Sequence, residues 1–266
     1  MKKIDLKGKK ALVTGGSQGI GAEICNQLAT CGADVFINYN NSSDKAEALA
    51  KKIKETYGTK AACFKADVSK AKEVEAMFLQ MDKEIGTVDI LVNNAGCESV
   101  VHVLDMEETT WDRIMDVNLK GPFLCSQYAA KRMESKSGGV IINISSIHDV
   151  VPRKGLIHYC SAKAGLKMFS KCLSLELAEK NIRVVSIAPG AIETNMNKKE
   201  IANFGKDKFE RWIPQGRIGN VSDVANTVAF MASDLADYIN GADIYIDGAY
   251  MNHTIQYDPR PARKKN

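Results

Sequence analysis

The sequence predicts an α/β fold built on a single doubly wound parallel sheet of about seven strands, with helices on both faces. Two observations lead to this prediction. Short apolar, β-branched runs alternate with amphipathic stretches of helical length along the chain, and a glycine-rich turn joins the first such pair. Parallel strands need crossover helices, which places helices on both faces. No Pro-rich or Ser-rich linker and no fixed repeat breaks the pattern, so residues 1–266 are expected to form one domain.

The elements follow one another in a regular order. Strands are expected at residues 11–13, 35–37, 62–64, 88–92, 140–144, 183–188 and 243–246. Helices are expected at residues 22–31, 44–57, 69–85, 109–136, 156–180 and 222–232. Residues 193–215 carry turn and helix signals without a strand, which indicates an insertion over the sheet edge and a candidate substrate lid. Residues 257–266 extend beyond the last strand.

Composition excludes several classes of function. The chain is 45% hydrophobic and 26% charged, and its net charge of +4 is spread along the sequence apart from a basic stretch, Arg260 to Lys265, so no nucleic-acid partner is expected. The start lacks the apolar core of a signal peptide, and no run is long enough to span a membrane, so a cytoplasmic protein is expected. The seven cysteines without CxxC spacing indicate reduced, mostly buried thiols, and the four histidines predict no metal site.

The turn from Thr14 to Gly21 follows a strand and opens a helix, which is the setting of a phosphate site. Gly15 would permit the tight turn, Gly19 the approach of backbone N–H groups to a pyrophosphate, and Gly21 the close packing of helix on strand. The spacing is GxxxGxG rather than GxGxxG, and a plain glycine-rich turn is the alternative.

The end of the second strand favours NADP(H) over NAD(H), although NAD(H) stays possible. Residues 38–43 are all neutral there, where an NAD site usually carries an acid that bonds the ribose 2′-hydroxyl. Without a carboxylate to repel it a 2′-phosphate is tolerated, and Asn40, Asn41 and Ser42 could bond it. No Arg stands there and Gln18 is neutral as well. The first acid, Asp44, is interpreted as part of a helix N-terminus.

Tyr159 and Lys163 stand four residues apart in a predicted helix, so the phenol and the ammonium share one face. A cation there stabilises a phenolate and would lower the pKa of Tyr159, as a proton donor and acceptor requires. Such a pair also arises by chance, so other motifs in the chain are needed to show whether it is catalytic.

The chain resembles the short-chain dehydrogenase/reductases from end to end. Its motifs occur in the family's order, as Thr14 to Gly21 (TGxxxGIG), Asp67-Val68, Asn93-Asn94-Ala95-Gly96 (NNAG), Asn118, Ser146 thirteen residues before Tyr159, Lys163, and Pro189-Gly190 with Thr194. One departure is Asp247-Gly248-Ala249 in place of the common DGG.

The resemblance implies a Rossmann-type fold, a homotetramer and a catalytic tetrad. Ser146 would bond the substrate oxygen, Tyr159 would exchange the proton, Lys163 would bond the nicotinamide ribose, and Asn118 would hold a water that links Lys163 to solvent. The cofactor would lie against Gly15, Ser17, Gln18, Gly19, Ile20, Gly21, Asp67, Val68, Asn94, Ala95, Gly96, Tyr159, Lys163, Pro189, Gly190, Ile192 and Thr194.

Two sets of residues point to different small-molecule substrates. Glu98 and His148 resemble the glucose 1-dehydrogenase branch and could bond the hydroxyls of a polyol. The candidate lid would instead offer an apolar surface to a steroid, through Met196, Ile201, Phe204, Phe209 and Trp212. The cations Arg153, Lys198 and Lys199 could meet an anionic side chain. Oxidation of a bile-acid hydroxyl with NADP is the preferred hypothesis; the alternatives are a glucose or polyol 1-dehydrogenase, a 3-oxoacyl reductase and a non-catalytic NADP-binding sensor.

Overall fold

The computed structural model describes residues 3–136, 138–194, 201, 203 and 205–252, and these contain one seven-stranded sheet in the order β3-β2-β1-β4-β5-β6-β7. All neighbouring strands run parallel, which confirms the predicted fold class. The strand order reverses between β1 and β4, where α/β sheets of this kind bind their ligands. The strands are β1 Lys10–Val13, β2 Asp34–Tyr39, β3 Ala61–Lys65, β4 Ile90–Asn93, β5 Gly139–Ile144, β6 Ile182–Pro189 and β7 Asp243–Ile246.

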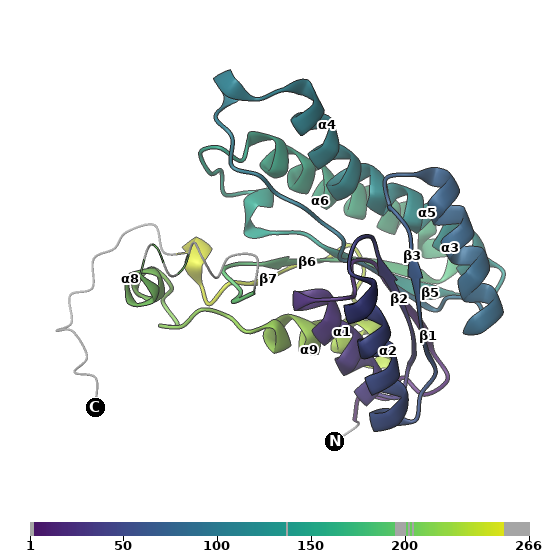
Figure 1. Cartoon of the computed structure of the whole chain (residues 1–266). Coiled ribbons are helices and arrows are strands. Elements are labelled where there is room, and N and C mark those ends of the chain that lie inside the picture. The colour runs from purple at the N-terminus through teal and green to yellow at the C-terminus, as the bar shows by residue number, and fades with distance from the viewer. Residues whose placement is uncertain (1–2, 137, 195–200, 202, 204, 253–266) are drawn as a thin grey trace, which may run out of the picture.

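Helices cover both faces of the sheet, as predicted (Figure 1). One face carries α1 Gly19–Thr30, α2 Ser43–Tyr57 and α9 Val221–Ala232. The other carries α3 Ala71–Glu84, α4 Glu108–Met115, α5 Gly121–Glu134 and α6 Ile157–Leu177. Short 3-10 helices are η1 Val103–Asp105, η3 Ile147–Asp149, η4 Ala178–Lys180, η5 Asp234–Ala236 and η6 Tyr250–Asn252.

The sheet separates two apolar cores. Side chains alternate along each strand, so Ala11 and Val13 pack toward α1, α2 and α9, while Leu12 packs toward α3 and α5. All three are fully buried, because both faces of β1 are covered. This double coverage explains why the central strands read as continuous apolar runs rather than as an alternating pattern.

Helix α2 illustrates how the sequence sets an element and its ends. Its buried residues recur at helical spacing and lie on one face, and they are Ala46, Leu49, Ala50 and Ile53. Asp44 lies in the first turn, where an acid is favourable, as predicted. The helix ends at Gly58, whose φ of 69° is the left-handed conformation that glycine adopts readily.

The single helix expected over residues 109–136 is wrong in one respect. Helices α4 and α5 are joined by a π-helical turn, η2 Asp116–Lys120, which contains the predicted site residue Asn118. A π turn inserts an extra residue into the helical ladder and often occurs at functional sites. A periodicity argument does not detect it, because the apolar pattern continues on either side.

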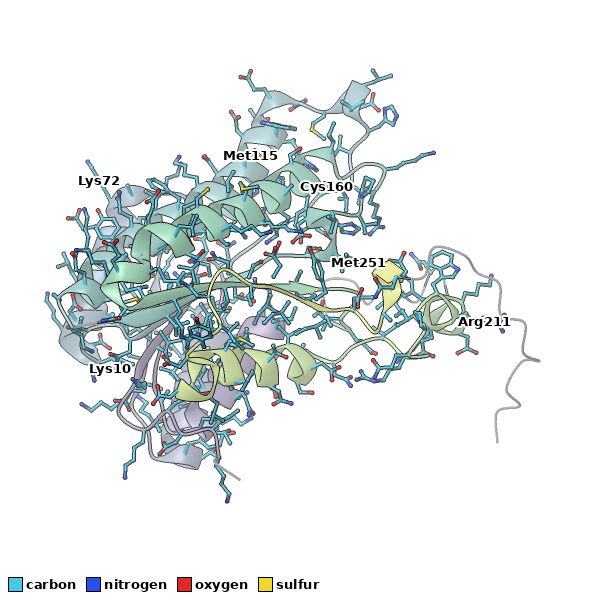
Figure 2. The ribbon with its side chains drawn as sticks, turned by 180° about the vertical axis from the view of Figure 1, so that it is seen from behind. Lys10, Lys72, Met115, Cys160, Arg211 and Met251 are labelled. Carbon is cyan, nitrogen blue, oxygen red and sulfur yellow. The ribbon has the colours of Figure 1, made fainter. Side chains whose placement is uncertain are left out.

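The carboxyl ends of the strands face the part of the chain that was predicted to be a lid. Helix α8 Lys206–Arg211 lies at this end beside η6, and in Figure 2 Arg211 and Met251 lie together there, while Lys10, which begins β1, lies at the opposite end. Met196, Lys198, Lys199, Phe204 and residues 257–266 lie outside the described residues. Within the described part, no helix is both long and apolar enough to cross a membrane.

The cysteines are less buried than predicted. All seven are free thiols, but only Cys25 and Cys125 are fully buried, and Cys172 is exposed. Cys172 lies on the outward side of α6. The remaining four are partly buried, and these are Cys31, Cys63, Cys97 and Cys160.

Candidate active site

One cavity of about 730 Å³ lies at the carboxyl ends of the strands. Every predicted site residue that the structure describes lines it, although the motifs are spread over most of the chain; Met196 and Phe204 lie outside the described residues. These lining residues are Gly15, Ser17, Gln18, Gly19, Ile20, Gly21, Asn40, Asn41, Ser42, Asp67, Val68, Asn94, Ala95, Gly96, Glu98, Asn118, Ser146, His148, Tyr159, Lys163, Pro189, Gly190, Ile192, Thr194 and Trp212.

The glycine loop is held in a shape that suits a phosphate. Gly15 has a φ of 61°, and a Cβ on Gly21 would lie 2.4 Å from the Gly15 carbonyl oxygen, so neither position tolerates a side chain. Helix α1 begins directly after this loop, has no acid in its first turn and receives no side-chain cap from Gln18. Its first N–H groups and its dipole therefore favour an anion in the cavity.

The NNAG segment braces this loop. The Thr14 hydroxyl accepts hydrogen bonds from the backbone N–H groups of Asn94 and Ala95, both at 3.0 Å. The Asn94 side chain donates to the carbonyl oxygens of Thr14 at 2.9 Å and Gly15 at 3.1 Å. The amide of Asn94 thus fixes the loop that would hold the pyrophosphate.

A cation that sequence reasoning missed lies beside the loop after β2. The Lys45 ammonium donates to the Gln18 side-chain oxygen at 2.8 Å, although 27 residues separate them. Lys45 stands in the first turn of α2, three residues after Ser42, the last of the neutral residues Asn40, Asn41 and Ser42. The sequence signal that could have identified this cation is its closeness to the loop after β2.

The proton-transfer residues meet where β5 leads into η3 and α6 begins. The Ser146 hydroxyl accepts from the His148 backbone N–H at 3.2 Å and shares a hydrogen bond with Tyr159. The Lys163 ammonium lies 5.6 Å from the centre of the Tyr159 ring and donates to the Ile144 carbonyl oxygen at 2.9 Å. Lys163 is only 4% exposed, so its charge acts in a site with little water.

The expected lowering of the Tyr159 pKa is wrong for the protein alone. Burial and then the Glu98 carboxylate raise the pKa of Tyr159 above its ordinary value, and the Ser146 hydrogen bond opposes them. Burial also lowers the pKa of Lys163 to about 8, against the opposing effects of Cys97, Asp149 and Glu98. Desolvation is therefore the largest influence on both pKa values, and at neutral pH Tyr159 is a protonated phenol.

The side chain of Asn118 is anchored through its amide nitrogen. Its nitrogen donates to the carbonyl oxygens of Cys97 at 2.8 Å and Ile114 at 2.9 Å. Its oxygen is buried and has no partner in the described part of the chain. A Cβ on Gly96 would lie 2.9 Å from that oxygen and 3.9 Å from the Lys163 nitrogen. A buried acceptor beside an ammonium favours a bridging polar group, because leaving it unpaired costs about 1–3 kcal/mol.

The substrate end of the cavity has a polar side and an apolar side. His148 packs edge-on against Tyr159, with ring centres 6.3 Å apart, and its Nδ1 donates to the Val151 carbonyl oxygen at 2.8 Å. Glu98 follows the NNAG segment, in a loop held by a 2.9 Å hydrogen bond between Ser99 and His158. The apolar side consists of Ile201, Phe209, Trp212 and Tyr250.

Other lining residues escaped the sequence prediction. The predicted site residues do not include Cys97, Arg113, Ser145 or Tyr250, which reach the cavity because the fold brings their segments together. Arg113 stands on α4, one face of which packs against α6. Among the described residues no group of three or more His, Cys, Asp or Glu side chains could hold a metal ion.

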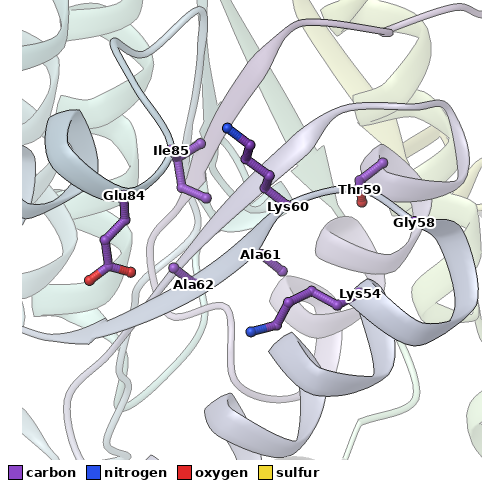
Figure 3. Close-up of a pocket in the computed structure, with 8 residues that line it drawn as sticks. All are labelled: Lys54, Gly58, Thr59, Lys60, Ala61, Ala62, Glu84 and Ile85. Atoms are coloured by element: carbon purple, nitrogen blue, oxygen red, sulfur yellow. The ribbon is translucent and has the colours of Figure 1, made fainter.

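A second hollow of about 480 Å³ lies far from these residues, at the edge of the sheet where α2 leads into β3 (Figure 3). Its charged lining residues are Lys54, Lys60 and Glu84. None of the predicted site residues lines it. The predicted site residues are therefore gathered in the cavity at the carboxyl ends of the strands.

The doubly wound sheet, the glycine loop and the Ser146, Tyr159 and Lys163 arrangement together define a dinucleotide-binding oxidoreductase. Residues 9–204 match the family model described as short chain dehydrogenase, and the chain belongs to this family, which uses nicotinamide cofactors.

Three known proteins show the range of activities among its relatives. The chain is 41% identical over 240 residues to the 3-oxoacyl-(acyl-carrier-protein) reductase FabG of Staphylococcus epidermidis, covering 90% of this chain and 98% of that protein. It is 40% identical over 246 residues to 3beta-hydroxysteroid dehydrogenase 1 of Eggerthella lenta, with 92% and 94% covered. A solved 7 alpha-hydroxysteroid dehydrogenase, complexed with NADH and 7-oxo glycochenodeoxycholic acid, superposes with a TM-score of 0.89 at 33% identity, covering 93% and 97%.

Proposed function

We propose that the protein transfers a hydride between NADP(H) and the carbon that bears a hydroxyl or oxo group on a steroid of the bile-acid type. The observation that carries the proposal is the composition of the main cavity. Tyr159 and Ser146 lie in it together with an apolar wall that includes Phe209 and Trp212, whose ring centres lie 6.0 Å apart. A flat apolar alcohol buries far more surface against such a wall than a sugar does.

The chain's own residues supply the proton chemistry of this reaction. When bound, a nicotinamide cofactor supplies or accepts the hydride. Ser146 donates a hydrogen bond to the substrate oxygen and holds it beside the Tyr159 hydroxyl. Tyr159 donates its proton to that oxygen during reduction and takes it back during oxidation. Lys163 presents a positive charge to the ring of Tyr159, and the Asn118 oxygen faces the space between Lys163 and Gly96.

The protonation states favour reduction at neutral pH. The raised pKa of Tyr159 keeps the phenol protonated, so a proton is ready for a carbonyl oxygen. Oxidation needs the phenolate, which forms more easily when a positive charge lies close. The enzyme is therefore expected to oxidise alcohols faster as the pH rises.

Two features support NADP(H) over NAD(H). The loop after β2 has no carboxylate in Asn40, Asn41 or Ser42, and all three residues line the cavity. The Lys45 ammonium lies against the Gln18 side chain, which lines the same region. A cation with neutral hydrogen-bonding groups around it suits a 2′-phosphate, whereas an NAD site usually carries an acid there.

Two relatives support a steroid substrate, and Arg153, which lines the cavity, brings a positive charge that suits the carboxylate of a bile acid. A 3-oxoacyl reductase is the second candidate, because the similarity to FabG is equally high. A polyol dehydrogenase is favoured by Glu98 and His148, and the solved gluconate 5-dehydrogenase of Burkholderia cenocepacia in complex with NADP and tartrate, 32% identical with a TM-score of 0.87, supports the same alternative. A non-catalytic sensor would have no use for the Ser146, Tyr159 and Lys163 arrangement.

Purified protein should be assayed with bile acids and their oxo derivatives, glucose and gluconate, and a 3-oxoacyl thioester, each with NADP(H) and NAD(H). The proposal predicts turnover of at least one bile acid with NADP(H) at a kcat/KM well above that of every other pair. Turnover of glucose or the thioester, with none of the bile acids accepted, would overturn the steroid assignment.

A homotetramer is proposed as well, following the family resemblance. Helices α5 and α6 expose apolar side chains that a partner would cover. Phe123 is 43% exposed, Met168 60% and Leu175 79%. Light scattering at low micromolar concentration tests this assembly, and a monomer would contradict it.

A further inference from the structure

A buried carboxylate lies directly behind the proposed proton-transfer residues. The side chain of Asp149, the last residue of η3, is fully buried. It accepts a hydrogen bond from the Ser145 hydroxyl at 3.0 Å and one from the Tyr245 hydroxyl at 3.0 Å. The Lys167 ammonium donates to that same Tyr245 oxygen at 2.6 Å and lies 3.9 Å from Asp149.

These contacts join three elements that are far apart in sequence. Tyr245 belongs to β7, Lys167 to α6 and Ser145 to the end of β5, and 96 residues separate Asp149 from Tyr245. The motifs of the chain do not explain them, because none of these four polar residues belongs to the predicted tetrad. Burying a charge is costly unless it is paired and hydrogen-bonded, and these contacts offset that cost for Asp149.

The first consequence concerns the position of Ser146. This residue begins the turn that Asp149 ends, and the Asp149 backbone N–H donates to the Ser146 carbonyl oxygen at 2.9 Å. The side chain of Asp149 then ties the turn to β7 and to the residue before Ser146. With both ends of the turn fixed, the Ser146 hydroxyl is held toward Tyr159.

The second consequence concerns the charge of Lys163. The titratable groups that act on its ammonium are Cys97 and Glu98 from the loop after β4, and Asp149 from η3. Cys97 is a thiol and Glu98 is exposed, so Asp149 is the buried carboxylate of this set. The hydrogen bonds place it nearby, because the Lys163 ammonium donates to the Ile144 carbonyl oxygen at 2.9 Å and the next residue, Ser145, donates its hydroxyl to Asp149 at 3.0 Å. Asp149 is itself faced by Lys167 and, from β7, by Asp243, which pairs with Lys171 at 3.0 Å.

We propose that Asp149 is a positioning residue of the active site, which holds the Ser146 turn in place and supplies the negative charge that keeps Lys163 an ammonium ion. The proposal rests on the reaction assigned above to Ser146, Tyr159 and Lys163, whatever the substrate. Asp149 touches neither the substrate oxygen nor the hydride; it acts through its neighbours.

The Asp149→Asn variant separates the two roles. An asparagine keeps the shape: its oxygen can accept from Tyr245, and its nitrogen can donate to the Ser145 hydroxyl, which rotates. Only the charge is lost, and Lys167 loses one of the two carboxylates that lie 3.9 Å from it, so both changes disfavour a second ammonium nearby. Because burial raises the pKa of Asp149, the ionised form costs stability at neutral pH, and D149N is expected to melt no lower than the wild type. The Asp149→Ala variant removes the anchor as well.

The test measures kcat/KM for carbonyl reduction between pH 6 and 10, on whichever substrate the wild type accepts. Activity should fall along an alkaline limb near the Lys163 pKa of about 8. In D149N this limb should move about one pH unit lower, because the loss of a nearby negative charge lowers the pKa of the Lys163 ammonium by about that much. D149A should show the same shift and a kcat at pH 6.5 at least about tenfold lower. The matched control, Asp243→Asn, removes the other carboxylate that lies 3.9 Å from Lys167 and should leave the limb in place.

The pH dependence of the Kd for NADPH provides a second measurement that needs no turnover. Lys163 lines the cofactor cavity, and its charge attracts the cofactor. The alkaline loss of NADPH binding should move in D149N as the activity limb does. A wild type that turns over no substrate would defeat the proposed function and leave this binding test standing. If the alkaline limb of D149N superimposes on that of the wild type in both measurements, the charge role is refuted. If the kcat of D149A equals that of D149N, the positioning role is refuted.

Discussion

Replacing Lys45 with alanine should weaken the binding of NADP(H) and leave the binding of NAD(H) nearly unchanged. The Lys45 ammonium lies 2.8 Å from the Gln18 oxygen, in the first turn of α2 and beside the neutral loop after β2. A charge-assisted contact of this kind contributes about 1.5–3 kcal/mol when it is well shielded. Lys45 is exposed, so the lower end applies, and about 1.4 kcal/mol corresponds to a tenfold change in Kd.

The assay is a fluorescence titration of Lys45→Ala with NADPH and with NADH at fixed, low ionic strength. The Kd for NADPH should rise about tenfold, while the Kd for NADH should change by less than about threefold. The control is Lys51→Ala on the same helix, which removes an exposed lysine that pairs with Glu55 at 3.9 Å and should alter neither Kd. Equal weakening of both cofactors would refute the 2′-phosphate role, and so would an unchanged NADPH affinity.

Two further predictions concern stability and pH. Ala249 has a φ of 69° where the family commonly has glycine, so Ala249→Gly should relieve strain of about 1 kcal/mol and raise the melting temperature by about 2–4 °C, which calorimetry measures; a lower melting temperature would contradict this. Glu98→Gln removes a carboxylate that raises the pKa of Tyr159, so the phenolate needed for alcohol oxidation should form at lower pH. The rise of oxidation kcat/KM with pH should then move down by less than about one unit, and a move upward would show that the sign is wrong.

The elements and their order could be predicted because local patterns determine them. Apolar runs such as Val140 to Ile144 form strands that are covered on both faces of the sheet. Helices such as α2 have one apolar face and are followed by a glycine that ends them. The π turn around Asn118 could not be predicted, because one extra residue in a helical ladder leaves the apolar period almost unchanged. The cavity itself follows from topology, since most of the predicted motifs stand at the carboxyl ends of parallel strands, and η2 and α6 bring Asn118, Tyr159 and Lys163 to the same end.

Contacts between distant segments were beyond sequence reasoning. Lys45 reaches Gln18 only because α2 packs beside α1, and Asp149 meets Tyr245 only because β7 lies next to β6. The sign of the Tyr159 pKa shift was also wrong, since a spacing of four residues gives proximity to Lys163 but not the depth of burial. Desolvation is a property of the packed site, and it dominates both pKa values there.

The Tyr159→Phe variant tests the central claim, that the Tyr159 hydroxyl exchanges the proton during hydride transfer. The ring and its contacts with Lys163 and His148 remain, so cofactor binding should stay within about threefold of the wild type. Loss of a general acid or base costs about 10²–10⁴ in rate, so kcat should fall by at least a hundredfold. The decisive measurement is single-turnover oxidation of NADPH by the variant on an accepted ketone: a near-complete loss of rate with NADPH still bound is the predicted result, and a rate close to that of the wild type would contradict the account.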